Sequence, residues 1–253
     1  MRTFLAAAAT ALAMTFALAP PAAAFDPAAM SDTERSAFRA EVRAYLLENP
    51  EVLMEAIEVL DERHQAQQAQ EDLSILRQNA AALNADPDSW VGGNPEGDIT
   101  VVEFVDYRCG YCRRAFEEVK ELVESDGNIR LVMKEYPILG EDSVASSRFA
   151  VAVLQLEGGE AYEAVHEALL SLRGSPEPEA LAAIADDLGL NAAALLAHME
   201  SADVERVIAT NRALGQRLAI NGTPTFVIHE TMVRGYVPLD GMRQIVAGQR
   251  GKM

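Results

Sequence analysis

The sequence predicts an α/β fold with an inserted helical region, preceded by an N-terminal helical segment. Two apolar runs at 99–105 and 129–136 flank a helical stretch, and this order indicates a βαβ unit with a right-handed parallel crossover. A region with helical patterning then extends over about 143–219. A pair of short apolar runs and a final amphipathic stretch follow it, which predicts an antiparallel hairpin and a closing helix.

The first 24 residues have the composition of a secretory signal peptide. Arg2 is the one charge in 1–24, an Ala-rich apolar run follows it, and small residues ending at Ala24 offer a cleavage site. A membrane anchor is the alternative, but the run is short and is interrupted at Pro20-Pro21. We therefore expect an exported protein in a compartment where disulfides persist.

Residues 25–62 are predicted to form a helical oligomerisation segment. Ser31 and Glu34 have the spacing of a capping box, and Asn49-Pro50 should end one helix and cap the next. Two helices this short cannot bury an apolar stripe by themselves, so the stripe should pack on the rest of the chain or on another copy of the segment. It consists of Phe38, Val42, Leu46, Leu53, Ile57 and Leu60.

Residues 63–90 are predicted to form a polar helical linker. Gln, Ala and Glu favour a helix at 61–72, but no core-facing stripe is present there. Asp86-Pro87 should end the helical stretch, and the Gly-rich stretch 92–98 is predicted to be a turn. The side chains expected to resume contact with the following domain are Leu73, Leu76 and Leu83.

Residues 91–253 contain the predicted α/β domain. The strand at 99–105 should lead into a helix that begins at the cysteines and ends at Asp126-Gly127. Glycines and prolines divide the insertion at 143–219 into four or five helices. The remaining predicted elements are a strand at 129–136, hairpin strands at 224–228 and 231–235, and a helix at 239–248.

The two cysteines of the chain, Cys109 and Cys112, lie where a strand meets a helix. A disulfide between residues this close stabilises the fold by only about 2 kcal/mol. A structural zinc site usually needs four Cys or His ligands, and the four histidines have no ligand spacing. A redox pair fits better than either alternative, because the helix N-terminus stabilises a thiolate at Cys109 and Cys112 can resolve a mixed disulfide. We expect no cofactor and no resident metal.

The C-G-Y-C motif after a strand, the helical insertion and N-G-T-P-T-F at 221–226 resemble the DsbA-like class of thioredoxin-fold proteins. The resemblance covers residues 98–250. It implies a thioredoxin fold with a helical domain inserted in it, and catalytic roles for both cysteines. It also implies that the Thr223-Pro224 peptide bond is cis and faces the cysteines.

The stretch FRAEVRAYLLENPEVLMEAIEVL, within 33–62, resembles the N-terminal segment of periplasmic suppressor-of-copper-sensitivity (ScsC-like) proteins. In such proteins, this segment can join subunits. The resemblance implies a periplasmic protein that forms a homotrimer or homodimer through 25–62. Its implied partners are unfolded or misoxidised exported proteins and a membrane redox protein that resets the cysteines.

The residues between the cysteines bear on the direction of exchange. Gly110-Tyr111 carries no basic group that would further stabilise the thiolate, which suggests a mild oxidant. C-G-Y-C with Thr223 before the proline also resembles DsbC-type disulfide isomerases, and several active sites around one client favour isomerisation. We favour an isomerase. The alternatives are a dithiol oxidase and a Cu(I)-binding protein that uses both thiolates as soft ligands.

Glu103 lies in the apolar strand before the cysteines, where a carboxyl group is costly without a partner or a function. DsbA-like proteins often carry a Glu beneath the disulfide, so the resemblance implies that Glu103 assists proton transfer. We expect Lys134 as its partner, and the alternative is an exposed carboxylate at the strand end. Tyr111 is expected to point outward and to contact clients.

The net charge of the chain disfavours polyanionic partners. The chain carries 21 basic and 39 acidic residues, a formal net charge of −18. Such an acidic protein is poorly suited to nucleic acid and to anionic membrane surfaces. We interpret the acidity as a contribution to solubility and expect no nucleic-acid partner.

Overall fold

The computed structural model describes residues 27–252 of the chain. The chain divides into two compact units, and the boundary lies between Leu60 and Asp61. The predicted signal peptide, 1–24, lies outside the described residues. Within 27–252, no helix combines the length and the apolar character that a bilayer crossing requires.

The first unit contains a short 3₁₀ turn at Pro27–Ala29, the helix α1 at Asp32–Glu48 and the start of α2, which spans Glu51–Gln78. The Ser31 hydroxyl accepts a hydrogen bond from the Glu34 amide at 3.4 Å. The Glu34 carboxylate accepts one from the Ser31 amide at 2.9 Å. These reciprocal bonds confirm the predicted capping box.

Asn49 and Pro50 separate the two helices, but Asn49 closes α1, and the prediction that it caps α2 is not supported. Its backbone and side-chain amides both donate to the Tyr45 carbonyl, at 2.8 and 2.9 Å. The side-chain amide is therefore engaged in satisfying the last turn of α1. α2 then continues to Gln78 without a break, so the helix predicted at 61–72 is confirmed.

The end of α2 and the short helix α3, Ala80–Asn84, pack on the second unit's sheet. Leu76 and Leu83 are buried in one core cluster, and the third leucine predicted to resume contact is half-buried. On α2, the buried Asp72 accepts two hydrogen bonds from the Arg234 guanidinium, at 2.6 and 2.7 Å. This bidentate ion pair fixes the end of α2 against the last strand.

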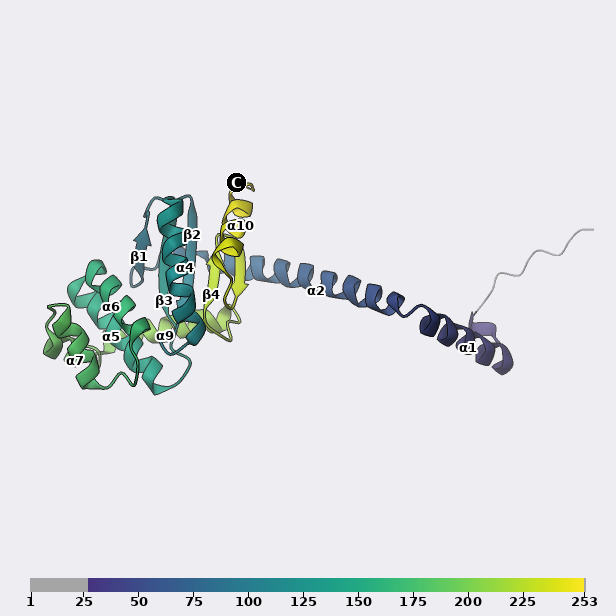
Figure 1. The fold of residues 1–253 in the computed structure, drawn as a ribbon, viewed down its shortest axis with the longest axis horizontal. Helices are drawn as coiled ribbons and strands as arrows, with labels where there is room; N and C mark the ends of the chain where they lie inside the picture. The colour runs from purple at the N-terminus through teal and green to yellow at the C-terminus, as the bar shows by residue number, and fades with distance from the viewer. Residues whose placement is uncertain (1–26, 253) are drawn as a thin grey trace, which may run out of the picture. The chain divides into compact units, whose positions relative to one another are not determined.

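A five-stranded sheet forms the centre of the second unit, in the order β1-β3-β2-β4-β5 (Figure 1). β2 and β3 are parallel, and the other neighbouring pairs are antiparallel. The helix α4, Gly110–Asp126, connects β2 to β3, which confirms the predicted βαβ unit. The strands are β1 Trp90–Gly93, β2 Ile99–Val105, β3 Ile129–Glu135, β4 Thr225–Ile228 and β5 Thr231–Arg234.

The turn predicted at 92–98 is confirmed for 94–98, where the Gly97 amide donates to the Asn94 carbonyl at 2.9 Å, but the edge strand β1 corrects its first two residues. Gly92 and Gly93 lie in β1 and pair with β3. A Cβ atom at Gly93 would lie 2.5 Å from the Ile129 carbonyl oxygen, and its φ is +67°. Gly93 therefore permits a close approach of two backbones within the sheet, which the composition alone does not distinguish from a turn.

Five helices lie between β3 and β4, and α10 follows β5 as the predicted closing helix. Three of them, α5, α6 and α7, gather at one end of the sheet (Figure 1). The six helices are α5 Glu141–Glu157, α6 Gly159–Ser171, α7 Pro178–Asp187, α8 Ala192–His198, α9 Ala202–Arg217 and α10 Leu239–Arg250.

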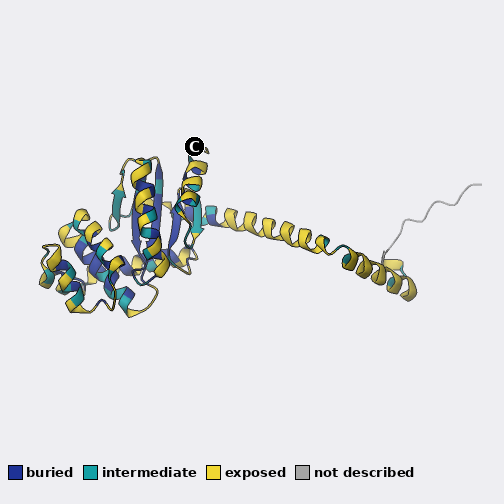
Figure 2. Ribbon diagram, in the orientation of Figure 1, coloured by how far each residue is buried: buried dark blue, intermediate teal, exposed yellow. Residues whose placement is uncertain are grey.

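The sheet separates two cores because side chains of a strand alternate between its faces. On β2, Val101 and Val105 belong to the core under α4, whereas Val102 and Phe104 belong to the core with Leu76. α10 packs on α4 and β2, and α3 and α9 contact the central strands. Figure 2 shows the strands buried between helices whose outer faces are exposed.

Candidate active site

Both cysteines lie at the start of α4, where the sequence predicts them. Cys109 is the N-cap residue, and its Sγ accepts a hydrogen bond from the Cys112 amide at 3.4 Å. The same Sγ lies 3.1 Å from the carbonyl oxygen of Thr223, to which the thiol donates. The Thr223-Pro224 peptide bond is cis, which confirms the prediction. The fold thus brings the loop before β4 against the first cysteine.

The surroundings of Cys109 favour its thiolate form. Its pKa is lowered to about 5, first by a hydrogen bond from the Cys112 thiol and against the effect of burial. The Thr223 side chain and the amides of Tyr111 and Cys112 lower it further. The Thr223 hydroxyl is buried and has no hydrogen-bond partner within the described residues, so it is available to a thiolate at Cys109.

The surroundings of Cys112 disfavour its thiolate form. It is almost fully buried, and its pKa is raised by the hydrogen bond to Cys109, by burial and by the charge of Glu103. A thiolate is the attacking species in disulfide exchange. The geometry therefore supports Cys109 as the residue that reacts with an external disulfide. Cys112, which is buried, is then the residue that can resolve the mixed disulfide.

Glu103 is buried on β2, so the alternative of an exposed carboxylate is wrong. The expected partner is also wrong, because Lys134 pairs in register with Phe104 and its side chain lies on the other face of the sheet. Lys134 Nζ donates to Asp86 Oδ2 at 2.5 Å and to the Ala82 carbonyl at 2.9 Å. Successive side chains of a strand point to opposite faces, so a difference of one residue in register separates Glu103 from Lys134.

The Glu103 carboxyl group is protonated through most of the neutral range. Burial raises its pKa to about 8, and the negative charges of Cys109 and Glu135 add to the shift. A carboxyl group with a pKa near the operating pH can both release and accept a proton. The structure thus gives Glu103 the chemistry that a proton-transfer role requires.

A buried polar cluster that the sequence did not predict lies beside this site. Glu135 Oε1 accepts hydrogen bonds from the hydroxyls of Tyr107 and Tyr162, at 2.7 and 2.6 Å. His166 Nδ1 lies 2.8 Å from the Tyr107 hydroxyl. Burial raises the pKa of Glu135 to about 7 and lowers that of His166 to about 3, so the imidazole is neutral. The sequence signal for this cluster was Glu135, a second acid at the end of an apolar strand.

Asp106, directly after β2, organises the loops around the cysteines and was also missed. Its carboxylate accepts hydrogen bonds from the backbone amides of Arg108, Ile138 and Leu139, at 2.8, 2.8 and 3.1 Å. It accepts a fourth from the Ser143 hydroxyl at 2.7 Å. The carboxylate therefore holds the loop after β3 against the loop that carries Cys109.

Aromatic side chains surround the mouth of the site. Tyr111 is exposed, as expected, and stacks on Tyr236 with a centroid distance of 6.2 Å. The Arg114 guanidinium lies 4.4 Å from the centre of the Tyr236 ring. Ile138 and Leu139 are exposed on the loop that Asp106 holds. Within 27–252, no group of three or more His, Cys, Asp or Glu side chains is arranged to hold a metal ion.

Two family models match the chain. The DSBA-like thioredoxin domain matches residues 100–247, and the copper resistance protein ScsC N-terminal domain matches residues 34–67. Among curated proteins, Na(+)/H(+) antiporter NhaA 1 of Salinispora arenicola is 28% identical over 162 residues, which are 64% of this chain and 25% of that protein. The chain therefore spans about a quarter of the length of this curated relative.

Many solved structures are similar to this one, including the following three. A thioredoxin-like oxidoreductase from Silicibacter pomeroyi is 44% identical, with 68% of this chain and 97% of that chain covered and a TM-score of 0.64. Proteus mirabilis ScsC in a transitional conformation is 26% identical over 90% of this chain and 100% of that chain, with a TM-score of 0.65. Salmonella enterica Typhimurium BcfH is 27% identical, with 85% of this chain and 95% of that chain covered and a TM-score of 0.70.

The DSBA-like match alone covers more than half of the chain, and it includes both cysteines, the helical insertion and the cis proline. The second match lies on the N-terminal helices. The chain belongs to the DsbA-like thioredoxin-domain family, in the ScsC-like form that carries an N-terminal helical segment.

Proposed function

We propose that this protein is a periplasmic thiol:disulfide interchange protein that acts as a disulfide isomerase on misoxidised exported proteins. The observation that carries the exchange chemistry is the position of Cys109 at the start of α4, where hydrogen bonds lower its pKa to about 5. The N-terminal match to ScsC and the signal-like leader support the choice of compartment and of subfamily. A similar structure is that of a periplasmic thioredoxin-like protein from Salmonella.

The exchange begins when the Cys109 thiolate attacks one sulfur of a client disulfide. The client S–S bond breaks, a mixed disulfide with Cys109 forms, and the other client sulfur leaves as a thiolate. In isomerisation, a client thiolate then attacks the mixed disulfide and restores the Cys109 thiolate, with no net change in oxidation state. If rearrangement stalls, Cys112 attacks Cys109 and releases a reduced client.

The release step requires Cys112 to lose a proton, and we assign its transfer to Glu103. The thiol of Cys112 is buried and its pKa is raised, partly by the charge of Glu103. Glu103, with a pKa of about 8, can take the proton in its ionised form and return it when the cysteines are reduced again. Thr223 and Pro224 line the other side of Cys109 and are proposed to position the client backbone.

We propose that the N-terminal segment joins subunits, as a homotrimer or a homodimer. Val42, Leu53, Ile57 and Leu60 are all exposed in the described unit, at 41 to 52%. Burial of each such side chain is worth about 1.5–3 kcal/mol. Association of identical segments in a closed symmetric oligomer is a direct way to bury them. Several Cys109 sites would then act on one client at high effective concentration.

Refolding of a scrambled multi-disulfide substrate, together with light scattering, tests this proposal. Ile57→Glu should reduce the mass to that of a monomer and remove most isomerase activity, while oxidation of small dithiols continues. Gln70→Glu places the same charge on an exposed site of α2 outside the stripe and should change neither. A monomeric wild-type protein, or full isomerase activity in Ile57→Glu, would overturn the multivalent proposal.

A dithiol oxidase is the second candidate, and the pKa of Cys109 favours it. A value of about 5 lies between those typical of thioredoxin, about 7, and of the strong oxidant DsbA, about 3.5. A stabilised thiolate favours the reduced form and makes the disulfide more oxidising. A reduction potential closer to that of DsbA, with no repair of scrambled substrate, would favour the oxidase.

Cu(I) binding remains a third proposal that rests on the same two thiols. Two thiolates are suitable soft ligands only when both cysteines are reduced. Copper titration of the reduced protein, in parallel with the refolding assay, distinguishes it. Loss of copper binding in Cys112→Ser with retained exchange at Cys109 would separate the two activities. The membrane redox protein that resets the cysteines is likewise proposed from the resemblance alone.

A further inference from the structure

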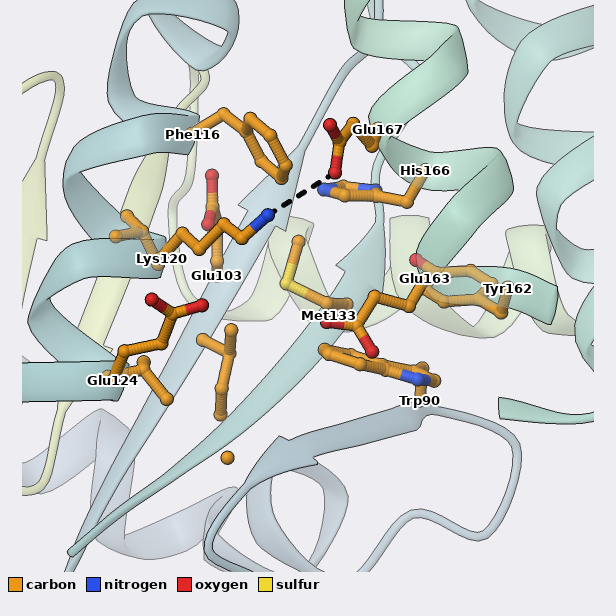
Figure 3. Close-up of a pocket in the computed structure, with 14 residues that line it drawn as sticks. Trp90, Glu103, Phe116, Lys120, Glu124, Met133, Tyr162, Glu163, His166 and Glu167 are labelled. Carbon is orange, nitrogen blue, oxygen red and sulfur yellow. Dashed lines mark hydrogen bonds and ion pairs between the residues drawn. The ribbon is translucent and has the colours of Figure 1, made fainter. Parts of the chain in front are cut away.

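A cavity of about 240 Å³ opens between α4 and α6, on the sheet face that carries Glu103. Figure 3 shows side chains of α4, among them Phe116 and Lys120, on one side and those of α6, among them Tyr162 and His166, on the other. Trp90 of β1 closes one end, and its ring stacks on Tyr162 with a centroid distance of 5.5 Å. The cavity is smaller than the pockets that hold drug-sized molecules.

The floor of the cavity contains an unpartnered acid. Glu103 is 4% exposed, lines the cavity and has no hydrogen bond or ion pair among the described residues. Its neighbours in the wall are apolar, such as Val119, Leu131 and Met133. A buried polar group without a partner costs free energy, which a complementary ligand can recover.

The mouth of the cavity is acidic. Of its charged side chains, Lys120 is engaged by Glu167, at 3.4 Å. Glu124 of α4 and Glu163 of α6 are exposed and have no ion pair among the described residues. His166 adds no charge, because burial lowers its pKa to about 3. Apart from Glu103 on the floor, the strands contribute only uncharged side chains, so the mouth has an excess of negative charge over the one paired lysine.

We propose that this cavity binds a small organic ammonium compound with an aromatic or aliphatic body. The ammonium group would pair with Glu103, and the body would lie between the aromatic side chains of Trp90 and Phe116. Aromatic rings attract cations through their faces, and the acidic mouth would raise the local concentration of a cationic ligand. An anionic ligand of the same size would be repelled by the same groups.

Binding should be coupled to a proton. Glu103 is mostly protonated at neutral pH because burial raises its pKa to about 8. An ammonium group beside it stabilises the carboxylate, so binding releases a proton wherever the free protein holds one. Affinity should therefore rise as the pH rises from 6 toward 9, as long as the ligand stays protonated.

Fluorescence titration tests this proposal directly, because Trp90 is the one tryptophan of the chain and lines the cavity. The probes are 2-phenylethylamine, the neutral 2-phenylethanol and the anionic 3-phenylpropionate, added to the full-length protein. The amine should give a saturable change in Trp90 fluorescence and bind at least tenfold more tightly than either analogue. Calorimetry in buffers of different ionisation enthalpy should detect proton release with the amine.

Two variants locate the interaction. Glu103→Gln should weaken amine binding at least tenfold and remove most of the proton release and of the rise of affinity with pH. A smaller part can remain, because Glu135, whose charge acts on Glu103, has a pKa of about 7. Glu179→Gln makes the same substitution on the exposed face of α7, outside the cavity, and should bind as the wild type does. Circular dichroism verifies folding of both. Equal binding of the three probes, no saturable response, or unchanged binding in a folded Glu103→Gln protein would overturn the proposal.

Discussion

Lowering the pH from 8 to 5 should leave Cys109 reactive toward iodoacetamide, whereas an ordinary thiol loses nearly all of its reactivity. The pKa of Cys109 is about 5, so about half of it is thiolate at pH 5 and nearly all of it at pH 7. A free cysteine with a pKa of about 8.5 is about 0.03% thiolate at pH 5 and about 3% at pH 7.

The thiolate fraction by itself overstates the effect on the rate, because nucleophilicity falls as the pKa falls, with a Brønsted slope of about 0.4–0.5. A pKa that is about 3.5 lower reduces the reactivity of each thiolate about 40-fold. The thiolate population is larger by about 1,600-fold at pH 5 and about 30-fold at pH 7. Cys109 should therefore react about 40 times faster than free cysteine at pH 5 and at about the same rate at pH 7.

The assay measures alkylation rates of the reduced protein against pH, with mass spectrometry of the peptides that carry Cys109 and Cys112. Cys112→Ala removes the hydrogen bond that lowers the pKa of Cys109 most, so the midpoint should move to higher pH. Cys112→Ser keeps a hydroxyl donor and should move it less. A wild-type midpoint near that of free cysteine, or faster labelling of Cys112 than of Cys109, would refute the reasoning.

Three further predictions concern the residues around this pair. Cys109→Ser should abolish exchange, and Cys112→Ser should accumulate mixed disulfides on non-reducing gels. If Cys112→Ser forms no mixed disulfides, Cys109 is not the attacking residue that Cys112 resolves. Glu103→Gln should raise the stability of the reduced protein by on the order of 3 kcal/mol at pH 7 and by nothing at pH 4, since the raised pKa costs stability as the pH rises from about 4.5 to about 8. Equal denaturation midpoints at pH 7 would contradict this. Asp106→Ala should lower stability by about 3 kcal/mol, because it leaves buried donors such as the Ser143 hydroxyl unsatisfied, and Asp106→Asn, which keeps one acceptor oxygen, should cost less; equal losses would point to a purely steric role.

Local signals in the sequence determined most of the elements and the place of the cysteines. The apolar run before Cys109 and the turn at Gly127 define a strand and a helix within a short stretch, and the structure gives Gly127 a left-handed φ of 69°. Capping of α1 by Ser31 depends on residues three apart. Each of these depends on neighbours in the chain, whose geometry is set by backbone sterics and hydrogen bonding alone.

Contacts between distant residues were decided only by the tertiary structure. Thr223 meets Cys109 across 114 residues, and its position was implied by resemblance and not by any local pattern. The predicted pairing of Glu103 with Lys134 was wrong because the register of β2 on β3 places the two side chains on opposite faces of the sheet. The pKa of Glu103 and the role of Asp106 depend on burial and on loops that converge from separate elements. A sequence specifies which groups are present, but the free energy of a charge or a hydrogen bond depends on the neighbours that the fold brings to it.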